Sequence, residues 1–143
     1  MFASLSHSEV AVIIGLVGSV ALVLLGRSLR RRRELLVYGV GLGITAVGYV
    51  VFALLRGAPA GYLGPELVGA VLFGSAAVLG TRRWPALLAV GWTAHVVWDL
   101  LLHPASAPAY APVWYPWFCV GFDVFVGGYI AGLITEQRAR PAR

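Results

Sequence analysis

Two histidines and an aspartate recur at helical spacing within an otherwise apolar stretch. The segment GWTAHVVWDLLLHP covers residues 91–104 and contains His95, Asp99 and His103. Neighbouring members are four residues apart, so their side chains line one face of a helix, with a drift of about 40° per step. Imidazole and carboxylate groups are ligands for zinc, iron or manganese, and they also transfer protons near neutral pH. The spacing therefore indicates a metal site or an acid–base pair.

Three of the six acidic residues lie inside apolar segments. They are Glu66, Asp99 and Asp123. An ionisable group at membrane depth costs about 2.5–3.5 kcal/mol on insertion scales, and it usually faces the protein interior and finds a partner. Glu66 and Asp123 are therefore candidates for the same site as the histidine stripe. The other three acidic residues stand at segment ends, where we expect them to face the lipid headgroups: Glu9, Glu34 and Glu136.

The elements that must position these groups are five apolar segments. Apolar residues make up 59% of the chain and charged residues only 12%, whereas soluble domains carry about 25% charged residues. A membrane span needs about 20 residues, with a range of about 17–25. The five candidate spans are roughly 9–26, 35–55, 63–80, 85–103 and 116–134. We predict a single all-α domain over residues 1–143, a polytopic membrane helix bundle in which the third span is the shortest.

The arginines orient this bundle. The chain has eleven arginines and no lysine, and the arginines cluster in 27–34, 81–84 and 135–143, with only Arg56 elsewhere. Five spans bring all three clusters to one side, as the positive-inside rule expects for the cytoplasmic side. The N-terminus is then outside and the C-terminus cytoplasmic, as in a multi-pass protein of an inner (cytoplasmic) membrane. The net charge of +5 does not indicate nucleic acid, because the charges stand in short clusters between apolar runs.

This topology brings the ionisable groups to one depth. At about 1.5 Å per residue, Asp99 lies about 6 Å and His95 about 12 Å below His103. Asp123 enters the membrane from the same surface and lies about 10 Å below it. Glu66 stands near the outer start of the third span. Helix periodicity and arginine placement therefore predict, independently of each other, one site in the outer half of the bilayer.

A metal site is the first interpretation of this cluster. His95 and Asp99 would supply two ligands, completed by Asp123 or Glu66 from another helix. His103 precedes a proline, and a residue in that position is pushed away from helical geometry, so it could fold back over the site as a further ligand. A two-metal site that shares Asp99 is also consistent with the spacing. The predicted divalent metal is zinc, iron or manganese.

Metal-free acid–base chemistry is the second interpretation. Asp99 and Asp123 would be the core carboxylates and His95 a base or ligand, with Glu66 completing the catalytic set. An apolar or amphipathic substrate, such as a lipid or an isoprenoid, would enter from the membrane and undergo an isomerisation, cyclisation or hydrolysis. The rival interpretations are a small transporter or metal-binding protein, and a structural polar network in which interhelical hydrogen bonds contribute about 0.6 kcal/mol each.

Aromatic residues are the candidates for the substrate-contacting wall. The predicted set is Trp92, Trp98, Tyr49, Trp114 and Trp117. The loop 104–115 is uncharged and ends in aromatic residues, which is typical of an interfacial aromatic belt and also of a gate for an amphipathic ligand. From size alone, a second copy of the chain could be needed to enclose a cavity, so a homo-oligomer is possible.

Two glycine pairs have the spacing of helix-packing motifs. Gly39 and Gly43, and also Gly128 and Gly132, are four residues apart inside apolar segments. Small residues at this spacing let helix backbones approach closely in lipid. We therefore expect both pairs to lie at helix contacts.

The pattern resembles a family of small bacterial integral membrane proteins classed as a domain of unknown function. The resemblance covers roughly residues 64–130 and rests on a glutamate, an H-x-x-W-D-x-x-H-H motif and a C-x-x-x-D motif. The matching residues are Glu66, His95, Trp98, Asp99, His103, Cys119 and Asp123. Leu102 stands where the family has the first histidine of its pair, so a site that requires that histidine would be incomplete. The resemblance implies a membrane protein with a candidate site but no reaction. On its own, Cys119 is interpreted as a small packing residue.

Overall fold

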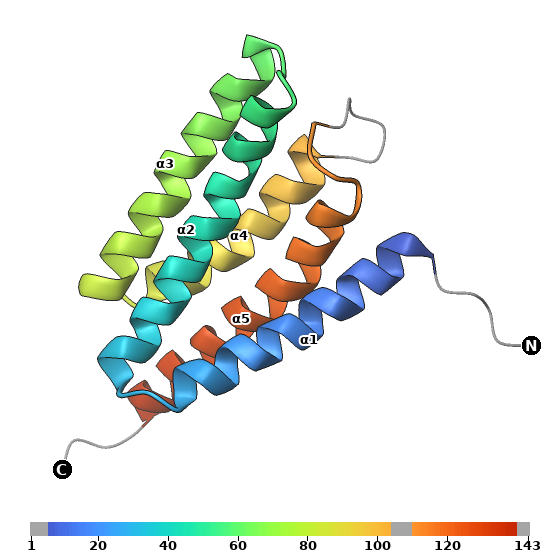
Figure 1. Ribbon diagram of the computed structural model, residues 1–143. Coiled ribbons are helices and arrows are strands. Elements are labelled where there is room, and N and C mark those ends of the chain that lie inside the picture. The colour runs from blue at the N-terminus through green and yellow to red at the C-terminus, as the bar shows by residue number, and fades with distance from the viewer. Residues whose placement is uncertain (1–5, 104–109, 140–143) are drawn as a thin grey trace, which may run out of the picture.

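The computed structural model describes residues 6–103 and 110–139, which form five α-helices and, within these ranges, no strand (Figure 1). The helices are α1 (His7–Arg27), α2 (Arg31–Leu55), α3 (Ala60–Arg82), α4 (Ala86–Leu102) and α5 (Trp114–Ala139). The all-α prediction is confirmed. Four of the helices, α1, α2, α3 and α5, are long and apolar enough to cross a membrane, which indicates a membrane protein.

The shortest helix is α4 and not α3, so the prediction for the third span was wrong. Helix α3 has 23 residues and continues past both ends of the predicted segment, whereas α4 has 17. Seventeen residues rise about 26 Å, close to the hydrocarbon thickness of about 30 Å. Helix α4 ends at Leu102 because His103, which precedes a proline, has left helical geometry with φ −119° and ψ 45°.

The helices form two pairs joined by α4, a parallel pair of α1 and α5 and an antiparallel pair of α2 and α3. Helix α1 packs on α5 and α2 packs on α3, while α4 contacts α5, α3 and α2 (Figure 1). Successive helices run in opposite directions, so the α1–α2 turn, the α3–α4 turn and the end of α5 meet at one end of the bundle. We call this end the arginine end, and the end with the α2–α3 turn and residues 110–113 the distal end.

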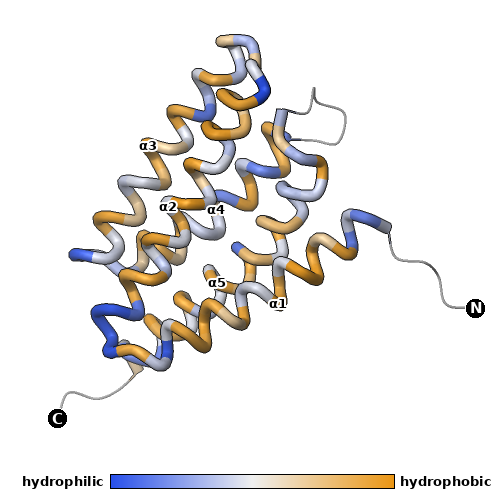
Figure 2. The backbone as a smooth tube through the Cα atoms, in the orientation of Figure 1, coloured by the Kyte–Doolittle hydropathy of each residue, from blue (hydrophilic) through white to orange (hydrophobic). Residues whose placement is uncertain are grey.

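Charge separates these two ends. Arg27, Arg30–Arg33, Arg82 and Arg83 lie at the arginine end, which is strongly hydrophilic in Figure 2. Of the arginines whose side chains are described, Arg56 alone lies at the distal end. By the positive-inside rule, this asymmetry predicts that the arginine end faces the cytoplasm. The orientation of the chain in the membrane remains a prediction.

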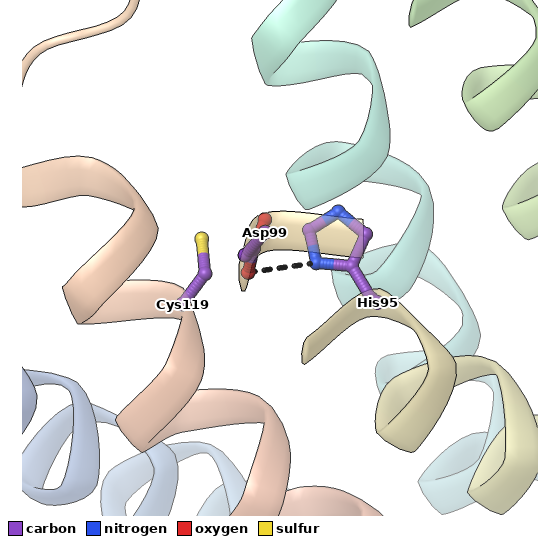
Figure 3. Close-up of side chains that lie close together, drawn as sticks. All are labelled: His95, Asp99 and Cys119. Carbon is purple, nitrogen blue, oxygen red and sulfur yellow. Dashed lines mark ion pairs between the residues drawn. The ribbon is translucent and has the colours of Figure 1, made fainter. Parts of the chain in front are cut away.

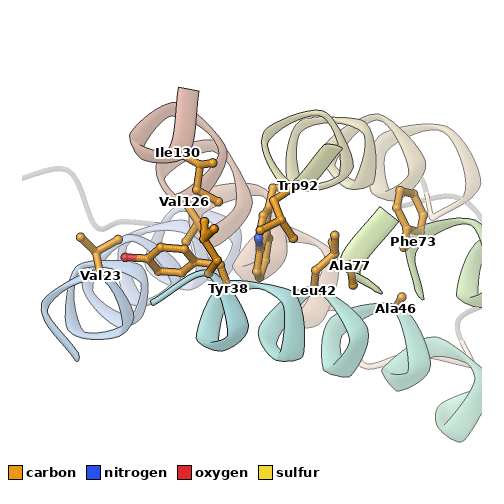
Figure 4. Close-up of a cluster of buried hydrophobic side chains, with 11 residues drawn as sticks. Val23, Tyr38, Leu42, Ala46, Phe73, Ala77, Trp92, Val126 and Ile130 are labelled. Atoms are coloured by element: carbon orange, nitrogen blue, oxygen red, sulfur yellow. The ribbon is translucent and has the colours of Figure 1, made fainter. Parts of the chain in front are cut away.

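The main apolar cluster of the interior lies towards the arginine end, and most of the buried polar groups lie nearer the distal end. The apolar cluster combines side chains from all five helices, among them Val23, Tyr38, Leu42, Leu88, Trp92, Val126 and Ile130 (Figure 4). The buried residues one to three turns nearer the distal end are instead Tyr49, Glu66, His95, Asp99, Cys119 and Asp123. Large apolar side chains cover the outside, as expected of a surface that faces lipid.

Glycines bring α1 and α5 into backbone contact. A Cβ atom at Gly15 would overlap the carbonyl oxygen of Phe118, and one at Gly121 would overlap the carbonyl oxygen of Val12. Gly39 also lies close to α3, as expected. The other three motif glycines are Gly43, Gly128 and Gly132, and an added Cβ at each would have nothing within 4 Å. The prediction that they lie at helix contacts inside the bundle was therefore wrong. Spacing identifies a small-residue face but not the helix that covers it.

A leucine at Gly15 is therefore expected to destabilise the bundle, because the α1–α5 backbone contact leaves no space for a side chain. Overpacking typically costs about 1–3 kcal/mol, and a clash with backbone belongs at the upper end. Thermal unfolding in detergent should show a lower midpoint for Gly15→Leu than for Gly128→Leu, the matched substitution at an open position. Equal midpoints would contradict the close α1–α5 contact.

Glu34 is buried, and the expectation that it faces the headgroups was wrong. Its carboxylate accepts hydrogen bonds from the hydroxyls of Tyr38 at 3.2 Å and Tyr129 at 3.1 Å, and Arg31 lies 3.2 Å from it. Glu34 stands in the first turn of α2, where a negative charge is favourable. The rotation of α2 turns it towards α5, so it ties these two helices together at the arginine end. Glu9 and Glu136 are exposed, as expected.

Candidate metal centre in the bundle interior

Helices α4 and α5 present the chemical groups to each other. His95 and Asp99 share one face of α4, and Cys119 and Asp123 share one face of α5, each pair four residues apart. One turn further along α5 is Gly127, where an added Cβ would lie 2.9 Å from Thr93 Oγ1 and 3.4 Å from the carbonyl oxygen of Ala89. This close approach of α5 to α4 is what brings the two polar faces together.

The resulting central cluster consists of Tyr49, His95, Asp99, Cys119 and Asp123. His95 Nδ1 and Asp123 Oδ2 share a hydrogen bond of 2.8 Å, and Asp99 Oδ2 lies 3.5 Å from the same nitrogen. The hydroxyl of Tyr49, on α2, donates to Asp99 Oδ1 at 2.7 Å. All five side chains are fully buried. The partner of His95 on the neighbouring helix is therefore Asp123, and not the alternative Glu66.

Three members of the central cluster lie close enough together that they could hold a metal ion. One ligand atom from each of His95, Asp99 and Cys119 lies within 4.8 Å of the other two (Figure 3). Zinc is held at about 2.0–2.3 Å by nitrogen, oxygen and sulfur, so tetrahedral ligands are separated by about 3.3–3.8 Å. Binding of zinc would have to draw the three atoms together to those separations. The sequence predicted His95 and Asp99 as ligands, and the structure adds Cys119.

Several polar atoms of the cluster lack a hydrogen-bond partner among the described residues. They are His95 Nε2, Asp99 Oδ2 and Asp123 Oδ1. A buried polar atom without a partner costs about 1–3 kcal/mol, and more when the group is charged. Two carboxylates beside one imidazole also concentrate negative charge in a medium of low polarity. A bound cation would satisfy both the unpartnered oxygens and this charge.

A second group of polar residues, the distal cluster, surrounds Glu66 of α3. Tyr110 donates to Glu66 Oε1 at 2.5 Å, Trp98 Nε1 donates to Oε2 at 3.4 Å, and His103 Nε2 lies 3.1 Å from Oε1 at an angle unsuited to a hydrogen bond. Burial and the Glu66 carboxylate raise the pKa of the Tyr110 hydroxyl, so it stays protonated and donates. The distal cluster fastens Tyr110, on the chain that leads into α5, to helix α3.

Tyr49 joins the two clusters. Its ring stacks on His103 with centroids 3.9 Å apart and an interplanar angle of 8°, while its hydroxyl reaches Asp99. His103 does fold back towards the bundle, as its position before a proline suggested. It lies against Tyr49 and Glu66, however, and does not join His95 and Asp99. The structure thus divides the residues that were expected at one site between two neighbouring clusters.

The predicted aromatic wall is also divided. Tyr49 lies in the central cluster and Trp98 in the distal cluster, while Trp92 is fully buried in the apolar core, packed against Phe122. Trp114 is half exposed, and Trp117 lines a groove beside α1. The last two therefore face the α1–α5 side of the bundle. Most of the predicted gate loop, residues 104–109, lies outside the described residues.

Comparison with protein-family models, with curated proteins and with solved structures finds no match. The resemblance to a family of uncharacterised membrane proteins therefore stays a prediction from the motif residues. Any functional conclusion depends on the geometry of the central cluster.

Proposed function

We propose that the protein is an integral membrane metalloenzyme with zinc bound by His95, Asp99 and Cys119. The single observation that carries this proposal is the meeting of three different ligand types, fully buried, within 4.8 Å of one another. Two of them come from α4 and one from α5, so the site depends on the packing of the two helices. The unpartnered carboxylate oxygens supply independent support.

The donor set favours zinc among the three metals that the sequence suggested. A thiolate is a soft ligand that suits zinc and iron, whereas manganese prefers carboxylate, carbonyl and water oxygens. Three protein ligands with a fourth position open to water or substrate is the arrangement of catalytic zinc sites. Such a metal lowers the pKa of bound water to about 7 and polarises carbonyl groups.

We assign Asp123 a role in the reaction and not in holding the metal. Its Oδ2 is 2.8 Å from His95 Nδ1, which is a hydrogen-bond distance and shorter than the separation of two ligands on one zinc ion. With Nδ1 held in this hydrogen bond, the metal would be bound through His95 Nε2, which has no partner among the described residues, and the carboxylate would orient the ring and raise its basicity. Its second oxygen, Oδ1, has no partner among the described residues and is free to accept a proton from water or substrate.

The location of the site suggests the substrate class. The central cluster is enclosed by helices whose outer surfaces are apolar along their length. A substrate that reaches it from the membrane would be apolar or amphipathic, such as a lipid or an isoprenoid. Metal-free acid–base catalysis is the second candidate, because the His95–Asp123 hydrogen bond would also form the core of a proton-transfer site.

Replacing Asp123 by asparagine tests the assigned roles. We expect Asp123→Asn to retain most of the zinc and to lose catalysis by about 100-fold or more, the usual contribution of a general base. Mass spectrometry of lipid extracts from membranes with wild type, Asp123→Asn or no protein would reveal the lipid class that changes only with wild type. A matched Asn substitution at the exposed Glu136 should leave that lipid change intact. Identical lipid profiles in wild type and Asp123→Asn would contradict a catalytic role.

A further inference from the structure

An apolar groove runs along the outer surface between α3 and α4. It has a volume of about 520 Å³, and its walls include Leu72, Phe73 and Ala76 on α3 and Ala94, Val97 and Trp98 on α4. The α4 wall extends from Leu87 to Leu102, a rise of about 22 Å along the helix. No lining residue carries an ionisable side chain. The groove therefore opens to the surface that faces the hydrocarbon of the membrane.

The inner wall of this groove is also the wall of the candidate metal centre. The Phe73 ring stands edge-on to His95 with centroids 4.8 Å apart, and edge-on to Trp98 at 5.7 Å. Phe73 is 6% exposed, and its ring lies between the groove and His95 of the central cluster. Trp98 lines the groove and, through Nε1, also donates to Glu66 of the distal cluster.

Two grooves beside α1 have no such contact with His95. One of about 450 Å³ and one of about 320 Å³ lie beside α1, and their lining includes Ile14 and Trp117. Neither groove includes a residue of the central or the distal cluster. The α3–α4 groove differs from these two because its wall includes Phe73, which contacts His95, and the groove of Ile14 provides a natural comparison.

We propose that the α3–α4 groove binds the hydrocarbon chain of the enzyme's amphipathic substrate, with Phe73 as the side-chain barrier between the membrane and His95. This inference rests on the proposed function and names where its substrate lies. The occupant is a hydrocarbon chain because the lining is apolar throughout, because the groove is elongated along the helix, and because it faces the membrane. Rotation of Phe73 would admit the polar end of the same molecule to the central cluster.

Site-directed photo-crosslinking tests this proposal. The photoreactive residue benzoylphenylalanine would be placed at Leu72 in the α3–α4 groove, and in a second protein at Ile14, which is equally exposed at 55% against 56%. Both proteins would be irradiated in native membranes and their lipid adducts identified by mass spectrometry. We expect several-fold enrichment of one lipid class at Leu72 and the bulk lipid composition at Ile14. Bulk composition at both positions would overturn the proposal.

A groove-filling variant separates specific binding from chance contact. Ala94→Trp places a large ring in the groove, whereas Ala21→Trp places the same ring on the exposed side of α1. We expect the first to abolish the enrichment at Leu72 and the second to preserve it, with zinc content unchanged in both. Enrichment that survives Ala94→Trp would overturn the groove proposal. Zinc that is absent from wild type, with enrichment intact, would instead refute the metalloenzyme.

Discussion

Replacing His95 by alanine is expected to remove the metal from the purified protein, whereas His103→Ala should retain it. His95 contacts Asp99 and Asp123 and lies in the cluster of ligand atoms with Cys119. His103 pairs with Glu66 and stacks on Tyr49. Loss of groups that merely support a metal ligand lowers metal affinity about 10–100-fold. Loss of the ligand itself should lower it further.

The two histidines make a matched pair for this test. His95 lies near the middle of α4 and His103 caps its C-terminal end, and their side chains are 0% and 7% exposed. Metal content would be measured by plasma mass spectrometry after purification in detergent, with circular dichroism to check that each variant is folded. If both variants lost the metal equally, or both kept it, the assignment of His95 as a ligand would be contradicted.

Replacing Glu66 by alanine is expected to cause the largest loss of stability among single substitutions in the distal cluster. Its carboxylate is 2% exposed and faces Tyr110, Trp98 and His103. Removing one partner of a buried charged pair typically costs about 3–5 kcal/mol. Here the substitution leaves the Tyr110 hydroxyl and Trp98 Nε1 without their acceptor, removes the carboxylate beside His103, and releases Tyr110 from α3.

Thermal unfolding in detergent would measure this effect. Glu136→Ala is the matched control, because Glu136 is exposed and we expect less than about 0.5 kcal/mol from such a surface change. Tyr110→Phe removes only one of the three contacts and should cost about 1–3 kcal/mol, since it leaves a buried acceptor with one donor fewer. A midpoint for Glu66→Ala equal to that of Glu136→Ala would show that the distal cluster does not stabilise the bundle.

The number and direction of the helices could be predicted from the sequence because both depend on strong, local signals. Apolar runs mark the helices, and arginine clusters mark the end at which alternate turns must meet. The boundaries depend on weaker effects. Helix α3 begins at Ala60, although glycine and proline occur in its first turns, because apolar side chains continue through them. Helix α4 is short because His103 leaves the helix before a proline.

The sequence could predict only the part of the site that lies on a single helix. The spacing of His95 and Asp99 on α4 is a property of the helix itself. The choice between Asp123 and Glu66 as their neighbour depends on how α3 and α5 rotate about their axes, which tertiary packing decides. Cys119 was interpreted as a packing residue because a single cysteine carries no spacing of its own. Its position four residues before Asp123 was the available signal.

The distribution of polarity inside the bundle explains why chemistry is possible there. The arginine-end half is filled by apolar side chains that fix the helices against one another, and Trp92 stands one turn below His95 in that core. The distal half contains the central and distal clusters, in which Tyr49 donates to Asp99 and Glu66 accepts from Tyr110. The packed apolar cluster thus fixes the helices that carry the central cluster. A preorganised metal centre requires such support from the surrounding side chains.

X-ray absorption at the zinc edge of the purified wild-type protein is the most direct test of the proposed centre. We expect about one zinc per chain, with one sulfur ligand at about 2.3 Å and nitrogen and oxygen ligands at about 2.0–2.2 Å. The sulfur shell should disappear in Cys119→Ser. A well-folded protein without stoichiometric metal, or with a metal that lacks the sulfur shell, would contradict the proposed metal centre.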